Sequence, residues 1–159
     1  MEHRKVIIWS YRINGRPITK KNSMQKTRRG LVQSSAYRDY ELSALWQLKR
    51  QRKPPEPIIR PVELYVSYYM PNKRSWPDLI GLIQATADIL EKARILDNDR
   101  LVVQISSQSG IWGIDKTNPR TFINVREITD KDNIAYQLDP YIIKHVKAGD
   151  YDLKGTTKE

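Results

Sequence analysis

The stretch that decides the fold is WPDLIGLIQATADILEKARILDNDRL, which runs from Trp76 to Leu101. Its apolar residues recur at the spacing of an amphipathic helix. The expected apolar stripe comprises Leu79, Leu82, Ile83, Leu90 and Ala93. An aspartate, Asp78, stands where this helix should begin, and two more follow its end in the tripeptide DND. The position of these three acids raises the question of whether they meet.

Local chemistry explains the aspartates without any ligand. Ser75 and Asp78 have the Ser-x-x-Asp spacing of a capping box, and Pro77 suits the first turn of a helix. Asp97 and Asp99 lie in a sequence that favours a turn. Helix rise alone would separate Asp78 from Asp99 by about 25 Å. They could share a metal ion only if the following loop folded back, which local sequence does not decide.

Outside this helix, the pattern predicts a small α+β domain. A further helix should begin at Ser35 and stop at the proline-rich residues 54–57. Strands are expected at residues 6–13, 61–70, 101–108 and 120–128. The order β, α, β, α, β, β predicts a single domain with a mixed four-stranded sheet and two main helices. Residues 1–127 should form this domain, and residues 128–159 a partly disordered extension with a short helix near residues 140–147.

Composition limits the chemistry that is available. The 159 residues include no cysteine and two histidines, which excludes disulfides and thiolate sites and disfavours a histidine-rich zinc site. Any metal site must therefore rest on carboxylates, which favour hard ions such as Mg²⁺, Mn²⁺ or Ca²⁺. No apolar run reaches membrane-spanning length and the N-terminus lacks a signal-peptide pattern. We therefore expect a cytoplasmic protein.

The charge points to a polyanionic partner. The net charge is +10 with a pI near 9.8, and the basic excess lies mainly in residues 1–60. Such an uneven distribution favours nucleic-acid binding over simple solubilisation. Two expected loops, one before each main helix, carry the candidate phosphate contacts. These are Lys20, Lys21, Lys26, Arg28 and Arg29 in the first loop and Lys73 and Arg74 in the second.

Four separated segments occur in a recognisable order. They are INGRPITKKNS, SSAYRDYE, MPNKRSWPDLIGLIQATADILEKARILDNDRLV and DKTNPRTFINV. Together they resemble the RusA-type Holliday-junction resolvases, small dimeric endonucleases common in prophages. The resemblance extends from about Val6 to Val125. It implies a RusA-like fold and a homodimer that cleaves branched DNA, the Holliday junction above all, in recombination and repair.

The resemblance also implies roles for the aspartates. Asp78 matches the first catalytic aspartate of the family, and Asp99 or Asp97 matches the downstream one, according to the register of the loop. In that family these carboxylates bind Mg²⁺, for which Mn²⁺ can substitute. A metal held in this way neutralises charge on a phosphodiester and activates the attacking water.

Three positions depart from the family signature. Ile80 replaces its second aspartate, Gly81 its asparagine, and Gln84 its usual lysine or acidic residue. Losing a ligand carboxylate should weaken metal binding. Two alternatives to an active nuclease therefore stay open. One is a catalytically impaired protein that still binds branched DNA, and the other is an interaction module that acts through residues 128–159.

Overall fold

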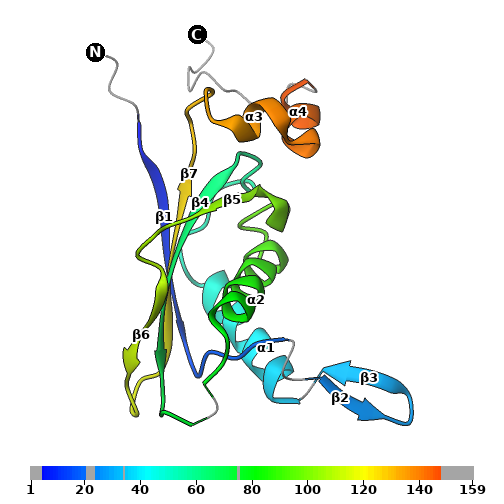
Figure 1. Ribbon diagram of the computed structural model, residues 1–159, viewed down its shortest axis with the longest axis vertical. Coiled ribbons are helices and arrows are strands. Elements are labelled where there is room, and N and C mark those ends of the chain that lie inside the picture. The colour runs from blue at the N-terminus through cyan, green and yellow to red at the C-terminus, as the bar shows by residue number, and fades with distance from the viewer. Residues whose placement is uncertain (1–4, 21–23, 34, 75, 148–159) are drawn as a thin grey trace.

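The centre of the molecule is a five-stranded mixed β-sheet, shown in the computed structural model of Figure 1. The structure describes residues 5–20, 24–33, 35–74 and 76–147. The strands are β1 (Ile7–Asn14), β4 (Val62–Met70), β5 (Val102–Ile105), β6 (Gly110–Ile114) and β7 (Arg120–Glu127). β7 lies between β1 and β4 and is antiparallel to both, whereas β5 and β6 are parallel to β4. The expected count of four strands was one too low, because the segment between the strands expected at residues 101–108 and 120–128 contains β6.

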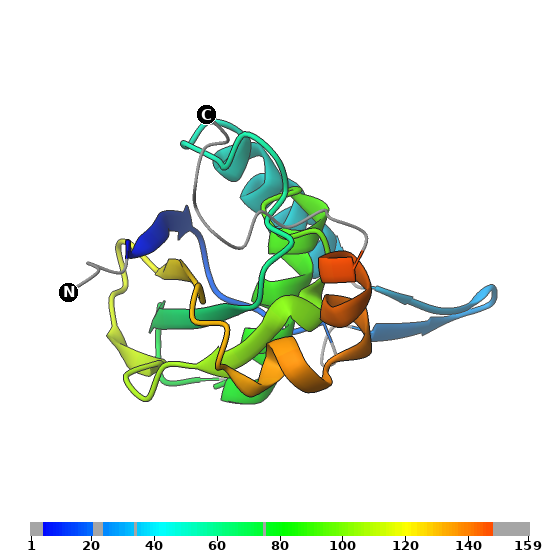
Figure 2. The ribbon, with the colours of Figure 1, turned by 90° about the horizontal axis from the view of Figure 1, so that it is seen from above.

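The hydrophobic core lies between this sheet and two helices. On β4, alternate residues face inward: Val62, Leu64, Val66, Tyr68 and Met70 are each at most 1% exposed. The helices α1 (Ser35–Lys49) and α2 (Leu79–Lys92) cover the same face of the sheet, as Figures 1 and 2 show. The predicted stripe of α2 packs on this core. The α+β class is therefore confirmed.

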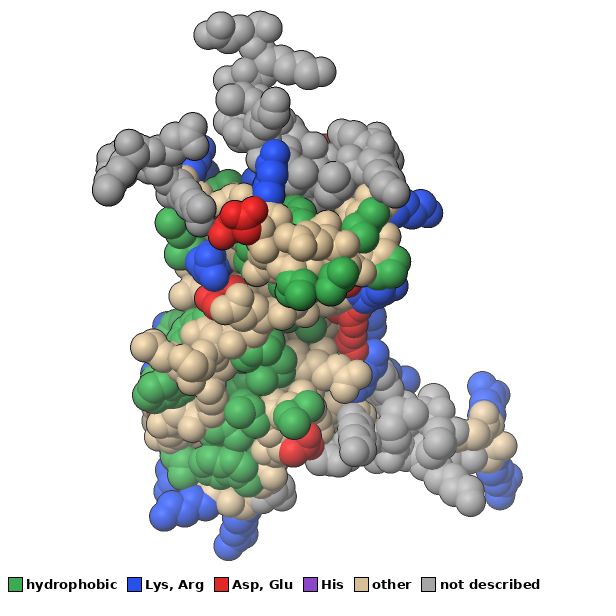
Figure 3. Space-filling model, turned by 45° about the horizontal axis from the view of Figure 1, so that its top comes forward, with side chains coloured by type: hydrophobic (Ala, Val, Ile, Leu, Met, Phe, Trp, Pro, Cys, Tyr) green, Lys and Arg blue, Asp and Glu red, His purple; other side chains and the backbone are tan. Residues whose placement is uncertain are grey.

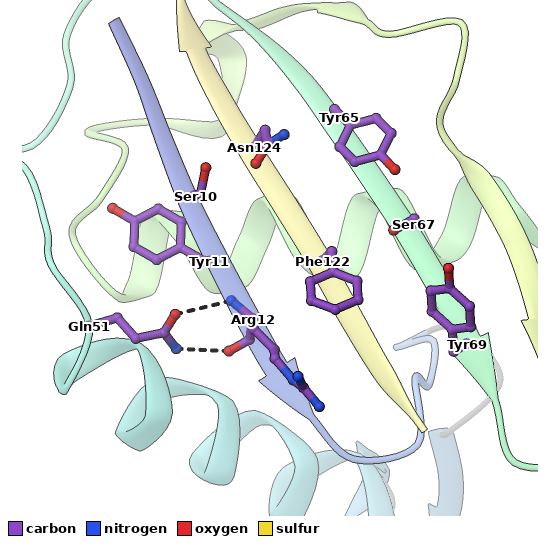
Figure 4. A pocket seen from close by; sticks show the side chains of 9 residues that line it. All are labelled: Ser10, Tyr11, Arg12, Gln51, Tyr65, Ser67, Tyr69, Phe122 and Asn124. Carbon is purple, nitrogen blue, oxygen red and sulfur yellow. Dashed lines mark hydrogen bonds between the residues drawn. The ribbon is translucent and has the colours of Figure 1, made fainter. Parts of the chain in front are cut away.

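The other face of the sheet is open and polar. Gln51, just beyond α1, accepts a hydrogen bond from the Arg12 amide at 3.0 Å and donates one to its carbonyl at 2.7 Å, which ties the end of α1 to the edge of β1. Beside this pair lies a shallow cavity of about 480 Å³ on the open face (Figure 4). Its floor combines aromatic rings with small polar side chains, namely Tyr65, Tyr69, Phe122, Ser10, Ser67 and Asn124.

A two-stranded hairpin projects from the body near the start of α1 (Figure 1). It consists of β2 (Met24–Thr27) and β3 (Gly30–Gln33), paired antiparallel. Gly30 has φ 103°, a left-handed value that glycine adopts without steric cost. The sequence predicts only a basic loop here, because polar residues hide the strand pattern. We call residues 24–33 the arm.

The C-terminal extension begins after β7 and forms two short helices. These are α3 (Ile134–Leu138) and α4 (Pro140–Lys147), and the second lies where a helix is expected. Ala135 and Ile142 are buried against Leu101 in a small second core. Residues 148–159, for which disorder is predicted, lie outside the described residues. Among the described helices, none combines the length and hydrophobicity needed to cross a bilayer.

Candidate metal centre and nucleic-acid interface

The end of α2 determines where the downstream acids lie. The helix stops in a Schellman motif, in which the Ile95 amide donates to the Leu90 carbonyl at 3.0 Å and the Arg94 amide donates to the Glu91 carbonyl at 3.0 Å. Arg94 adopts the left-handed φ of 60° that this motif requires. Ile95 and Leu96 then enter the core. The chain consequently turns back along the last turns of α2.

This reversal brings three carboxylates together. Asp88 and Glu91, three residues apart on α2, lie on one side of the helix. Asp99 begins the short 3-10 helix η2 (Asp99–Leu101), whose cap Asn98 accepts a hydrogen bond from the Arg100 amide at 2.9 Å. One oxygen from each of Asp88, Glu91 and Asp99 lies within 4.8 Å of the other two, and all three residues are half-buried. We call these three residues the acidic cluster.

The electrostatics of the acidic cluster suit a cation. Partial burial, followed by the negative charges of Asp99, Asp88 and Asp97, raises the pKa of Glu91 above its ordinary value. Lys20, from the segment before the arm, places Nζ 3.3 Å from Asp88 Oδ2. This ammonium offsets part of the charge.

Asp97 lies beside the acidic cluster but is engaged elsewhere. Its Oδ1 is 3.5 Å from Arg94 Nη2, and its Oδ2 accepts a hydrogen bond from the hydroxyl of Tyr141 on α4. Of the two downstream candidates, the structure thus places Asp99 among the clustered carboxylates and Asp97 next to them.

Asp78 lies at the opposite end of α2. It is the N-cap of the helix, and its Oδ2 accepts a hydrogen bond from the Gly81 amide at 2.8 Å. Ser75, the alternative cap, lies outside the described residues. Ten residues separate Asp78 from Asp88, which corresponds to about 15 Å along the axis. Within one chain, Asp78 is therefore not part of the acidic cluster.

The three positions expected to depart from the family signature lie on α2, after Asp78. A Cβ at Gly81 would lie 2.9 Å from Asp78 Oδ2 and 3.0 Å from Thr19 Cγ2. Glycine therefore permits the close approach of both groups. Ile80 is 79% exposed, so this side chain does not serve the core. Gln84 is exposed as well.

The described basic candidates lie on projecting or exposed parts of the chain. Arg28 and Arg29 form the exposed tip of the arm, and Lys73 and Arg74 are exposed between β4 and α2. Figure 3 shows basic side chains at the arm's tip and acidic ones on the flank between the arm and the tail helices. Lys21 and the side chain of Lys26 lie outside what the structure describes. Trp76 and Trp112 are exposed.

The acidic cluster fits a hard divalent ion. Its donors are carboxylate oxygens, the ligands that Mg²⁺ and Mn²⁺ prefer. Their mutual separation of at most 4.8 Å allows one ion to contact all three. Sequence reasoning overlooked Asp88 and Glu91, although two acids at helical spacing before a third acid in the next turn were a usable signal.

Comparison with known proteins agrees with this combination of fold and site. A small α+β domain with an acidic site and basic projections is suited to metal-assisted chemistry on nucleic acid. Residues 14–126 match the family model of endodeoxyribonuclease RusA. The chain is also 24% identical over 111 residues to the crossover junction endodeoxyribonuclease RusA of Aquifex aeolicus (strain VF5), which covers 69% of this chain and 84% of that relative. The chain belongs to the RusA family, and membership supports a Holliday-junction-resolving endonuclease at the level of the family.

Proposed function

We propose that this chain is a Mg²⁺-dependent, structure-selective endodeoxyribonuclease that cleaves Holliday junctions or other branched DNA during recombination and repair in the cytoplasm. The observation that carries the proposal is the acidic cluster of Asp88, Glu91 and Asp99, in a chain of the RusA family. Mn²⁺ should replace Mg²⁺ because both are hard ions with oxygen ligands.

The residues around the acidic cluster have complementary tasks. A bound ion would neutralise charge on the phosphodiester and lower the pKa of a water molecule. Asp88, Glu91 and Asp99 would hold the ion, and the Lys20 ammonium, 3.3 Å from Asp88, is close enough to pair with a phosphate at the same place. The basic tip of the arm and the Lys73–Arg74 loop would bind phosphates further along the backbone, which adds affinity without sequence preference.

The proposed homodimer follows the family and offers a role for Asp78. Asp78 and the acidic cluster lie at opposite ends of α2, so Asp78 can reach a metal site only in a second copy of the chain. Such a dimer would place one site at each of two symmetric strands. We infer that Asp78 of one protomer contributes to the site that contains Asp99 of its partner.

The test is cleavage of a synthetic four-way junction at low salt in Mg²⁺ and then Mn²⁺. Paired nicks are expected from the parent protein. Asp99→Asn and Asp78→Asn should each abolish cutting and leave junction binding intact. Asp132→Asn, which changes an exposed acid outside the site, should cut normally. Tight junction binding by the parent without nicks in either metal would instead support the catalytically impaired DNA-binding protein. The replacement of a ligand aspartate by Ile80 would then be the first explanation to test.

Mixing the two inactive variants tests the shared site. A heterodimer of Asp78→Asn and Asp99→Asn protomers retains one site in which both aspartates are native. Equal mixing should therefore restore nicking of one strand. If the mixture stays inactive while each variant is folded and dimeric, Asp78 does not contribute to the site of the partner protomer.

A further inference from the structure

The tail helices pack on the short segment that carries Asp99. Family similarity ends at residue 126, so α3 and α4 lie outside it. Ile142 of α4 and Leu101 of η2 are both fully buried, and Ala135 of α3 completes their contact. Leu101 follows Asp99 by two residues. The tail thus buries the residue that ends the turn containing this acid.

Polar contacts from the tail reach both sides of Asp99. On one side, the Tyr141 hydroxyl donates to Asp97 Oδ2. On the other side, Arg100 lies 3.7 Å from Asp139 Oδ1, and its guanidinium stands 5.9 Å from the centroid of the Tyr141 ring. Asp139 also accepts a hydrogen bond from the Tyr141 amide at 2.9 Å. The segment 97–101 is therefore held by the tail at both ends.

The acidic cluster itself supplies no force that would keep Asp99 in place. Three carboxylates within 4.8 Å repel one another until a cation binds. Groups that orient a metal ligand from outside are usual in such sites, and their loss lowers metal affinity.

We propose that the tail helices are a clamp that positions Asp99 for metal binding, with Tyr141 as the positioning residue and Asp97 as its anchor. This inference rests on the proposed metal-dependent function. Asp97 then serves the site by accepting the Tyr141 hydroxyl, and Asp99 serves it by binding the ion. The described part of the extension completes the nuclease domain, in contrast to the interaction module that the sequence left open.

The first experiment compares Tyr141→Phe with Tyr136→Phe in the full chain. Each variant loses one hydroxyl from the tail, but that of Tyr136 donates to the Ile128 carbonyl, away from the acidic cluster. Mn²⁺ affinity is measured by electron paramagnetic resonance titration without DNA. Amide hydrogen exchange in residues 97–101 is measured without metal. Tyr141→Phe should weaken Mn²⁺ binding about tenfold and speed exchange in this segment, whereas Tyr136→Phe should do neither.

Each readout can overturn the clamp separately from the proposed function. Unchanged exchange in Tyr141→Phe would show that the hydroxyl does not hold the segment. Faster exchange with unchanged Mn²⁺ affinity in Tyr141→Phe would show that the Tyr141–Asp97 contact stabilises the segment but does not position Asp99 for metal binding. Parent protein that binds no Mn²⁺ refutes the metal-dependent function, and exchange still reports whether the segment is held.

The second experiment separates an anchor from a ligand. Asp97→Asn keeps an oxygen that can accept the Tyr141 hydroxyl, so Mn²⁺ affinity should stay within about threefold of the parent. Asp99→Asn removes a ligand charge and should lower affinity at least about tenfold. Equal losses in the two variants would make Asp97 a ligand and overturn its role as anchor.

Discussion

The Glu91 carboxylate is repelled by neighbouring carboxylates when no cation is bound. This carboxylate is partly withdrawn from water and faces Asp88, Asp97 and Asp99. Arg94 offsets only part of this charge. Sites that bind a cation commonly carry such like-charge crowding, and the protein tolerates its cost because the ion removes it.

The raised pKa of Glu91 predicts a specific pH dependence. Because the folded protein binds this proton more tightly than the unfolded chain, stability should fall as pH rises from the ordinary value of 4.5 through the higher folded pKa. In EDTA, Glu91→Gln should therefore have a larger free energy of unfolding than the parent at pH 7. This advantage should vanish below pH 4.5. Urea denaturation across this range provides the measurement.

Glu63→Gln is the matched control, since Glu63 lies 3.2 Å from Arg126 Nε instead of among acids. It should show no such gain at pH 7. Added Mn²⁺ should make the parent more stable to urea than Glu91→Gln, because only the parent keeps all three carboxylate ligands. If the free energies of unfolding of the parent and Glu91→Gln changed in parallel with pH, the proposed repulsion at Glu91 would be contradicted.

The residues of the site show what the sequence could and could not reveal. Asp99 was a candidate because its type and place matched the family signature. Asp88 and Glu91 were overlooked because charged residues on the polar side of a helix are usually just solvated. Their role depends on the chain reversal after α2, and helical periodicity contains no information about such a reversal.

The chain reversal at the end of α2 requires a strained backbone conformation at one residue. Arg94 occupies a left-handed conformation, φ 60°, in which a side chain costs roughly 1–2 kcal/mol. Glycine is the usual residue at this position of a Schellman motif. The ion pair between Arg94 and Asp97 is long, at 3.5 Å, and the Arg94 side chain is exposed. This pair therefore contributes little to stability.

Arg94→Gly should consequently raise the free energy of unfolding by about 1 kcal/mol. Arg94→Ala is the control, because it removes the same ion pair but keeps a Cβ in the left-handed conformation. Denaturation of both variants in urea measures the difference. Equal stability of the glycine and alanine variants would mean that the backbone at residue 94 is unstrained in solution.

Among the elements, strong periodicity was informative and weak periodicity was not. The stripe of α2 and the alternation of β4 predicted both elements, since each buries a continuous apolar face. The strands β2, β3 and β6 were not predicted. They are four or five residues long and include glycine or polar residues, which weakens the local strand pattern. β6 also depends on pairing with β4, a partner distant in sequence, whereas β2 and β3 pair with each other in a hairpin.

At the scale of the whole molecule, the arm carries basic residues away from the body. The arm presents Arg28 and Arg29 at its tip, away from the sheet and helices (Figure 1). In the proposed complex with DNA, such an extension would contact phosphates beyond the acidic cluster. Contacts of this kind contribute through released counterions, so their number is measurable from salt dependence.

Replacing both arginines by alanine should therefore weaken junction binding and lower the log–log salt slope by about 2. Fluorescence anisotropy of a labelled junction at salt concentrations from about 50 to 200 mM gives the slope. The control replaces Lys49 and Arg50, two exposed basic residues at the end of α1, and removes the same charge. A similar change of slope in both double variants would indicate a general charge effect instead of contact by the arm.

The position of β7 between β1 and β4 has a consequence for synthesis of the protein. Among the strands that the structure describes, β7 is the last to leave the ribosome, yet it supplies a partner to β1 and to β4. Until residues 120–127 emerge, both neighbours present unpaired edges, which attract other chains. Products that stop short of β7 should therefore aggregate in the cell, and the intact sheet should form only once residues 120–127 have been synthesised.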